Sequence, residues 1–295
     1  MTSTLKIARL SCACLLILLA GCTQLSRSWY LSSCDRDIAN ATRAIESARD
    51  DSQRAAAYTE RGKAYSEKAR YGRAFNLVST EEYGRLFGLA MKDHDQAVAL
   101  NPASAEAYYS RGHARYDRAS LENGILVNGV LVDRAVMGDQ SIEGKNAQKP
   151  WFDAAAADFK RAVEKDPRYY LAWDRLGLVH EWAGDLDQAI RDYTEEMALN
   201  PLGRTRLADA YCARGSANQK DKKHDAAIAD YEKSIDTGAT ADGCSCDPYN
   251  PLLGLYNENR QYDKAWAVVQ RALMSGKWIA PELLEKLKKD SGRNN

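Results

Sequence analysis

Residues 170–203 read YLAWDRLGLVHEWAGDLDQAIRDYTEEMALNPLG, and this stretch decides the fold. Apolar residues recur at helical spacing on either side of Gly184-Asp185, which indicates two helices joined by a tight turn. Gly177 on the first helix and Ala189 on the second are small, so the two helices can approach closely. Pro201 lacks an N–H group and cannot continue the second helix.

The opening phrase of this stretch recurs along the chain, and in every copy an aromatic residue precedes a glycine by four positions. Recurrence of this kind is the mark of a repeat architecture. In the copy at residues 170–203, Trp173 and Tyr193 are expected to fill the space toward the neighbouring repeat. The copies are Tyr58…Arg61-Gly62, Tyr108…Arg111-Gly112, Trp173…Leu176-Gly177 and Tyr211…Arg214-Gly215.

This pattern resembles the tetratricopeptide repeat, a helix–turn–helix unit of about 34 residues, over roughly residues 55–275. The resemblance implies an all-α fold, a TPR-type α-solenoid of helix–turn–helix repeats. Two copies are lengthened, by about 16 and about 31 residues, which indicates two insertions. The expected repeat-packing residues are Gly62, Gly112, Trp173, Gly177, Ala189, Tyr193, Gly215, Ala227 and Tyr231.

The chain accordingly divides by sequence into four parts. We expect a lipoprotein signal peptide at 1–21, a tether at 22–33, helical repeats at 34–280, and a C-terminal capping helix with a tail at 281–295.

The second insertion, residues 117–150, contains a hairpin signal. Asn128-Gly129 separates the triplets Ile125-Leu126-Val127 and Val130-Leu131-Val132, and type I′ turns need a positive φ at both central residues. An isolated hairpin is marginal in water, so its apolar face must pack on something. That surface is either the solenoid itself or a partner protein.

The N-terminus has the pattern of a targeting segment. Lys6 and Arg9 precede an apolar run from Leu10 to Ala20 that is too short to span a bilayer with soluble flanks. The run ends in Leu19-Ala20-Gly21-Cys22, which resembles the lipobox of bacterial lipoproteins. The resemblance implies cleavage before Cys22 and acylation of its thiol. Thr23 follows instead of aspartate, which favours sorting to the outer membrane, facing the periplasm. The alternative is a plain secretory peptide with a chance cysteine.

The composition argues against several classes of ligand and reaction. Without residues 1–21 the chain keeps 39 basic and 41 acidic groups, so no excess of positive charge favours nucleic acid or an anionic membrane surface. His180-Glu181 begins like a zinc-protease motif but lacks the second histidine, so we expect no metal site. Neither phosphate-binding loops nor nucleophile motifs occur, and we expect neither an enzyme nor a cofactor beyond the covalent lipid.

Four cysteines follow the lipidated Cys22, and an even number in an oxidising compartment favours disulfides. These four candidates allow three pairings. Cys212 lies near the start of one helix, and the helix after it returns to the same point, so we expect Cys212 to pair with Cys244 or Cys246. The rival interpretation is a Cys-x-Cys metal or redox site. Cys34 is left either for the remaining thiol or for another protein.

Stacked repeats of this family curve, and their first helices line a concave face. By register with the family, Lys63, Tyr109, His113, Tyr116, Asp174 and Trp182 are candidate partner-binding residues on that face. Chaperone-binding members hold a peptide carboxylate with a clamp of lysine, asparagine and arginine, but here only Lys63 and Arg175 could hold an anion. The mixture of aromatic and polar groups suits an extended peptide or a helix. The same aromatics could instead pack between repeats.

These observations lead to the hypothesis of a lipid-anchored periplasmic adaptor that binds other envelope proteins. The first alternative is an accessory subunit of an outer-membrane assembly or secretion machine, and the second is an enzyme or a small-ligand binder. The sequence leaves the identity of the partner and the oligomeric state open.

Overall fold

A computed structural model describes residues 30–122, 125–127, 130–132, 142–238 and 246–293 of the chain. The expected signal peptide and Cys22 therefore lie outside the described residues. By internal contacts the chain divides into two compact units, Met1–Asp166 and Pro167–Asn295, and each is described by itself.

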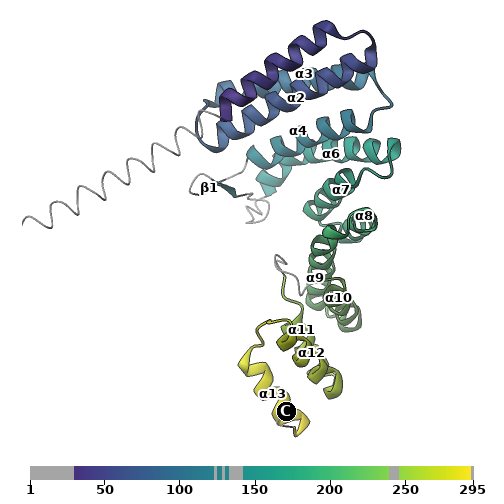
Figure 1. The fold of residues 1–295 in the computed structure, drawn as a ribbon. Coiled ribbons are helices and arrows are strands. Elements are labelled where there is room, and N and C mark those ends of the chain that lie inside the picture. Colours follow the sequence, from purple (N-terminus) through teal and green to yellow (C-terminus); the bar gives the residue numbers. More distant parts are fainter. Residues whose placement is uncertain (1–29, 123–124, 128–129, 133–141, 239–245, 294–295) are drawn as a thin grey trace, which may run out of the picture. The chain divides into compact units, whose positions relative to one another are not determined.

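The first unit is built from long helices packed side by side (Figure 1). Residues 30–47 are helical. This helix includes residues 30–33, which were expected to belong to the tether. Tyr30 at its start packs against Tyr71 of the next helix, with ring centroids 3.9 Å apart. The other helices are α2 (Asp51–Ala74), α3 (Thr80–Leu100), α4 (Ala105–Glu122) and α6 (Ile142–Lys165).

Side-chain caps fix where these helices begin. Asp50 accepts a hydrogen bond from the Gln53 amide at the start of α2, and Ser79 accepts one from the Glu82 amide at the start of α3. Both are standard N-cap contacts. Because α2 runs on to Ala74, the first insertion extends an existing helix pair and adds no new element.

The second insertion contains the expected hairpin. Strand β1 (Ile125–Val127) pairs antiparallel with β2 (Val130–Val132), and Val127 is the partner of Val130. The Asn128-Gly129 turn itself lies outside the described residues.

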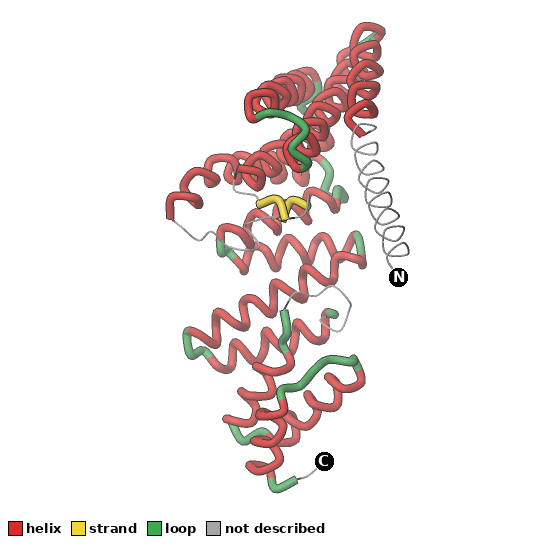
Figure 2. The backbone as a smooth tube through the Cα atoms, turned by 90° about the vertical axis from the view of Figure 1, so that its left-hand side faces the viewer, coloured by secondary structure: helices red, strands yellow, loops and turns green. Residues whose placement is uncertain are grey.

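The second unit consists of shorter helices that follow one another in pairs (Figure 2). Gly184, at φ 80°, ends the first helix in the left-handed conformation that favours glycine, and Asp185 caps the next by accepting from the Gln188 amide. The elements are α7 (Tyr170–Ala183), α8 (Leu186–Leu199), the short 3₁₀ helix η1 (Pro201–Gly203), α9 (Arg204–Lys220), α10 (His224–Thr237), α11 (Tyr249–Glu258), α12 (Tyr262–Met274) and α13 (Pro281–Ser291).

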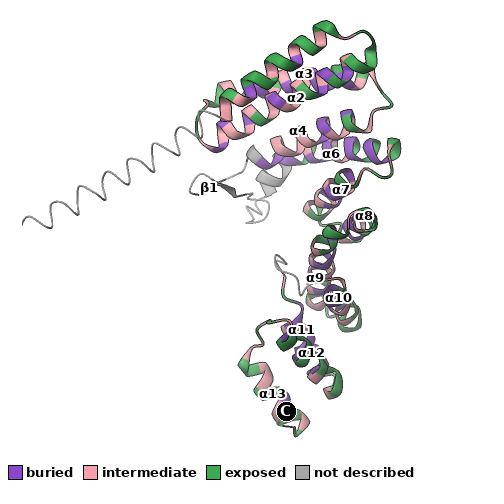
Figure 3. Cartoon of the chain, in the orientation of Figure 1, coloured by how far each residue is buried: buried purple, intermediate pink, exposed green. Residues whose placement is uncertain are grey.

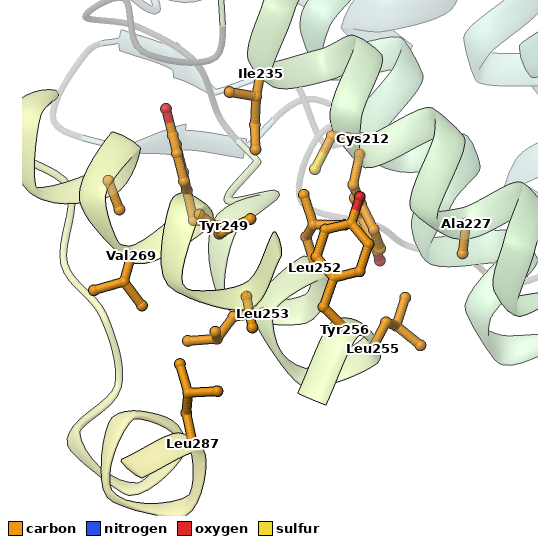
Figure 4. Packing of buried hydrophobic residues seen from close by; sticks show 14 residues of the cluster. Cys212, Ala227, Ile235, Tyr249, Leu252, Leu253, Leu255, Tyr256, Val269 and Leu287 are labelled. Atoms are coloured by element: carbon orange, nitrogen blue, oxygen red, sulfur yellow. The ribbon is translucent and has the colours of Figure 1, made fainter. Parts of the chain in front are cut away.

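Buried residues of the second unit concentrate between paired helices (Figure 3). A cluster from α9 to α13 includes Tyr231, Tyr249 and Tyr256 and reaches Leu287 of α13 (Figure 4). Leu287 is fully buried, so α13 covers the apolar end of this cluster as a capping helix does. The prediction of an all-α fold built from helix–turn–helix pairs is confirmed.

Candidate functional site

In four of the helix pairs, a glycine on one helix faces an aromatic ring of the other at close range. A Cβ atom added at Gly177 would lie 2.5 Å from Cε1 of Tyr193, closer than real Cβ contacts come. Gly112 meets Phe159 and Gly215 meets Tyr231 in the same way. In the pair α2–α3 the ring is a histidine, since a Cβ at Gly62 would lie 2.7 Å from Cε1 of His94.

The arginine before the glycine has a role that the sequence analysis missed. Arg214 of α9 donates to both carboxylate oxygens of Asp230 on α10, from Nε at 3.0 Å and from Nη2 at 2.6 Å. Arg61 makes the same two-point contact with Asp93, and Arg111 with Asp158. We call these three contacts the arginine staples.

Each staple also reaches the helix that precedes its own pair. Arg111 of α4 donates to Asp95 of α3 at 2.9 Å, and Arg214 of α9 donates to Asp187 of α8 at 2.5 Å. Arg61 donates to Thr42 at 3.3 Å. One guanidinium therefore ties three successive helices together.

In the repeat at residues 170–203, a contact between a histidine and an aspartate takes the place of the arginine staple. Leu176 stands where the other copies have arginine, and Nδ1 of His180 lies 2.5 Å from Oδ2 of Asp192. His180, the first residue of the incomplete zinc-protease-like pattern, thus joins α7 to α8 by a polar contact. The signal that could have revealed the staples is the aspartate before the aromatic residue of each second helix: Asp93, Asp158, Asp192 and Asp230.

A pocket of about 180 Å³ opens in the first unit between α2, α3 and α4. Lys63 and Arg70 line it from α2, His94 from α3, and Tyr109 and His113 from α4. Three of the predicted concave-face residues, Lys63, Tyr109 and His113, are therefore brought together.

Charges around this pocket are paired within the protein. The Lys63 ammonium donates to Glu60 at 2.9 Å and to Glu106 at 2.6 Å. On the other side, Nε of Arg70 lies 3.6 Å and Nδ1 of His113 lies 3.4 Å from the same oxygen of Asp117. The site therefore offers neither a free cation cluster nor a free anion cluster.

His94 is the most deeply buried polar residue of the pocket, with no exposed surface. Burial, with smaller contributions from the charges of Lys63 and Arg111, lowers the pKa of its imidazole to about 3. The ring is therefore neutral at physiological pH, with one nitrogen that donates and one that accepts hydrogen bonds.

The remaining predicted face residues lie elsewhere. The ring of Tyr116 packs edge-on against Phe152 at 5.4 Å between centroids. Asp174 is in the second unit, nearly buried, and forms an ion pair with Arg206 at 2.5 Å. Trp182 also belongs to the second unit, near the end of α7. The structure thus places Tyr116 in the first unit and Asp174 and Trp182 in the second, and a common face for them stays a prediction.

A disulfide joins Cys212 of α9 to Cys246, with the Cα atoms 6.1 Å apart. It is one of the two pairings that the sequence left open for Cys212. Cys34 is a buried free thiol, and burial raises its pKa to about 11. Cys244 lies outside the described residues, as does Cys22.

Two kinds of feature are absent from the described ranges. No group of three histidine, cysteine, aspartate or glutamate side chains there could hold a metal ion. Within the same ranges, none of the helices combines the length and the apolar character needed to cross a membrane.

Comparison with known proteins agrees with the helix pairing. A tetratricopeptide repeat family model matches residues 208–237, which fall in α9 and α10. The chain therefore has an all-α fold of the tetratricopeptide solenoid type. No curated protein sequence matches the chain.

Several solved structures are similar to the chain. MamA is 20% identical, with a TM-score of 0.41, covering 70% of this chain and 89% of MamA. YrrB, described as a TPR protein with an unusual peptide-binding site, is 16% identical with a TM-score of 0.41, covering 86% of this chain and 93% of YrrB. TTC0263, a thermophilic TPR protein of Thermus thermophilus, is 20% identical with a TM-score of 0.38, covering 82% of this chain and 95% of TTC0263.

Proposed function

We propose that this chain is a lipid-tethered adaptor of the bacterial envelope that binds other envelope proteins through the first unit. The observation that carries the proposal is the pocket between α2, α3 and α4, where Lys63, Tyr109 and His113 lie together. A surface that mixes aromatic rings with hydrogen-bonding groups suits an extended peptide or a helix from a partner.

The tether is part of the same proposal. Leu19-Ala20-Gly21-Cys22 follows a short apolar run, and acylation at Cys22 would hold the chain on the periplasmic side of the outer membrane. Several acyl chains give a stable anchor where one gives only reversible binding. The Cys212–Cys246 disulfide supports an oxidising compartment, because disulfides persist there and are rare in the cytosol.

Photo-crosslinking in intact cells tests the adaptor. A benzophenone amino acid replaces Tyr109 at the pocket in one strain, and Leu202 in the control strain. Leu202 is 82% exposed on η1 of the second unit, so it reports contacts of an ordinary surface position. We expect discrete adducts with an envelope protein from position 109 that position 202 does not give. Identical adducts from both positions, or none from position 109, would contradict the proposal.

A further inference from the structure

Four buried polar atoms at the pocket have no hydrogen-bond partner among the residues that the structure describes. They are Oγ of Ser66 on α2, Oγ of Ser110 on α4, and both ring nitrogens of His94 on α3. Buried polar groups in folded proteins are nearly always paired, because an unpaired one has lost its water and gained nothing. Three neighbouring helices each contribute such a group to one pocket, which marks a site built for a polar occupant.

The hydrogen-bonding character of these groups narrows the occupant. A neutral imidazole offers one donor and one acceptor, and each hydroxyl can serve as either. Their best complement is a group that both donates and accepts within a small volume. The pocket, at about 180 Å³, is also several times larger than the roughly 30 Å³ that one water occupies in the liquid.

The charges that line the pocket favour a neutral occupant over an ionised one. A carboxylate would lie among Glu67 and Asp117, and an ammonium group would lie among Lys63 and Arg70. The lining cations are already engaged with acidic partners, as described above for Lys63 and Arg70. An anion entering the pocket would lose hydration without gaining a free cation, and the charges of Lys63 and Arg70 would repel an entering cation.

We propose that the pocket formed by Ser66, His94 and Ser110 binds the side-chain carboxamide of an asparagine or glutamine presented by a partner protein. The carboxamide oxygen accepts from a hydroxyl or from the imidazole N–H, and its amide hydrogens donate to the remaining acceptors. This inference rests on the proposed adaptor function and assigns the class of side chain that the pocket selects.

Binding is tested by nuclear magnetic resonance on the full chain with ¹³C-labelled histidine. The probes are N-acetylglutamine methylamide, the matched glutamate compound, and the matched norleucine compound, which has neither amide nor charge. We expect a saturable shift of the His94 Cε1–H resonance with the glutamine probe alone. The His94→Phe variant, which lacks that resonance, assigns the signal.

Two serine variants separate binding from folding. Ser110→Ala removes a hydroxyl that has no partner in the protein, so we expect about three- to tenfold weaker binding with an unchanged or raised melting temperature. Ser234→Ala is the matched control: Ser234 is a fully buried serine of the second unit, and its hydroxyl donates to the Ala208 carbonyl at 2.7 Å. We expect it to lower the melting temperature and leave binding unchanged.

Three results would overturn the inference: equal or tighter binding of the glutamate probe, no saturable shift with the glutamine probe, or unaltered affinity in Ser110→Ala. Its failure is distinguishable from failure of the adaptor function. If crosslinking at position 109 captures a partner but the glutamine probe does not bind, the carboxamide assignment is wrong and the adaptor stands. If the probe binds and no partner is captured, the adaptor function is wrong and the carboxamide assignment stands.

Discussion

Position 94 carries a histidine where three other helix pairs place Phe159, Tyr193 or Tyr231 against the facing glycine. The ring has the right size for this position but contributes two nitrogens that no protein group among the described residues satisfies. An aromatic residue would pack as well on Gly62 and would leave no polar atom behind. The histidine is therefore unfavourable for stability, which is a common property of functional positions.

We predict that His94→Phe makes the fold less sensitive to acid. The pKa of His94 is about 3 when folded, against an ordinary value of 6.5, so the unfolded chain binds a proton in this range and the folded chain does not. The contribution of His94 to the free energy of unfolding is fully present above about pH 6.5 and is lost as the pH falls toward 3. At pH 5 the loss amounts to about 2 kcal/mol.

Urea unfolding of both proteins at pH 7.5 and pH 5 measures this difference. The wild type should lose more stability than His94→Phe between the two pH values, and the variant should be at least as stable at pH 7.5. Equal pH dependence in the two proteins would show that His94 can be protonated in the folded state.

We predict that Gly177→Ala destabilises the second unit by about 1–3 kcal/mol, because the new methyl group would meet the Tyr193 ring at 2.5 Å. Gly254→Ala on α11 is the control, since a Cβ there has nothing within 4 Å. Alanine is the better helix former, so this control should stabilise by about 0.5–1 kcal/mol. Thermal unfolding followed by circular dichroism compares the two, and a wild-type curve for Gly177→Ala would refute close packing at this glycine.

At the scale of elements, the arginine staples explain why helices of modest apolar content stay paired. The Asp230 side chain is only 6% exposed, so its charge needs a partner, and Arg214 supplies two hydrogen bonds in a fixed geometry. The same guanidinium holds Asp187 of the preceding pair, which couples the α7–α8 and α9–α10 pairs.

We predict that Arg214→Met destabilises the second unit by about 3–5 kcal/mol, since it leaves Asp230 buried and without its cation. Arg271→Met is the matched control. Its ion pair with Asp236 lies at the surface, with the two side chains 46% and 65% exposed, and should contribute less than about 1 kcal/mol. Denaturant unfolding measures both, and similar losses in the two variants would show that the staple has no special role.

The disulfide makes a second prediction at this scale. Cys212 and Cys246 are 34 positions apart, and Cys246→Ser should cost about 3–4 kcal/mol by releasing that constraint on the unfolded chain. Cys244→Ser serves as the control and should leave the unfolding midpoint unchanged. Mass spectrometry after alkylation should find Cys212 and Cys246 both unmodified before reduction and both modified after it. A midpoint that reduction does not move would contradict the prediction.

The sequence predicted the elements well and their polar contacts poorly, for a physical reason. Helical periodicity, Gly184-Asp185 and the hairpin turn are local signals, so they indicated helices, a turn and a β-hairpin directly. A staple joins residues 32, 47 or 16 positions apart, and only the folded pair shows which aspartate an arginine meets. The pocket was predicted only in part, because register placed Lys63, Tyr109 and His113 on one face but gave no sign that Ser66 and His94 lie beside them.

For the whole molecule, the prediction concerns the membrane. Cys22→Ser should abolish incorporation of labelled fatty acid and move the chain from the membrane fraction to the soluble periplasmic fraction, because the thiol is the acceptor of the proposed lipid. Cys34→Ser is the control and should keep both properties, since Cys34 is a buried thiol within the folded part. Labelling that persists in Cys22→Ser would refute the anchor.

The bond between Cys212 and Cys246 encloses α10 within a covalent ring. A protease that cuts the backbone once inside this ring opens it without releasing a fragment, so the nicked protein migrates as one species until a reductant is added. If the proposed lipid anchor is present, damage of that kind would leave the chain on the membrane in one piece.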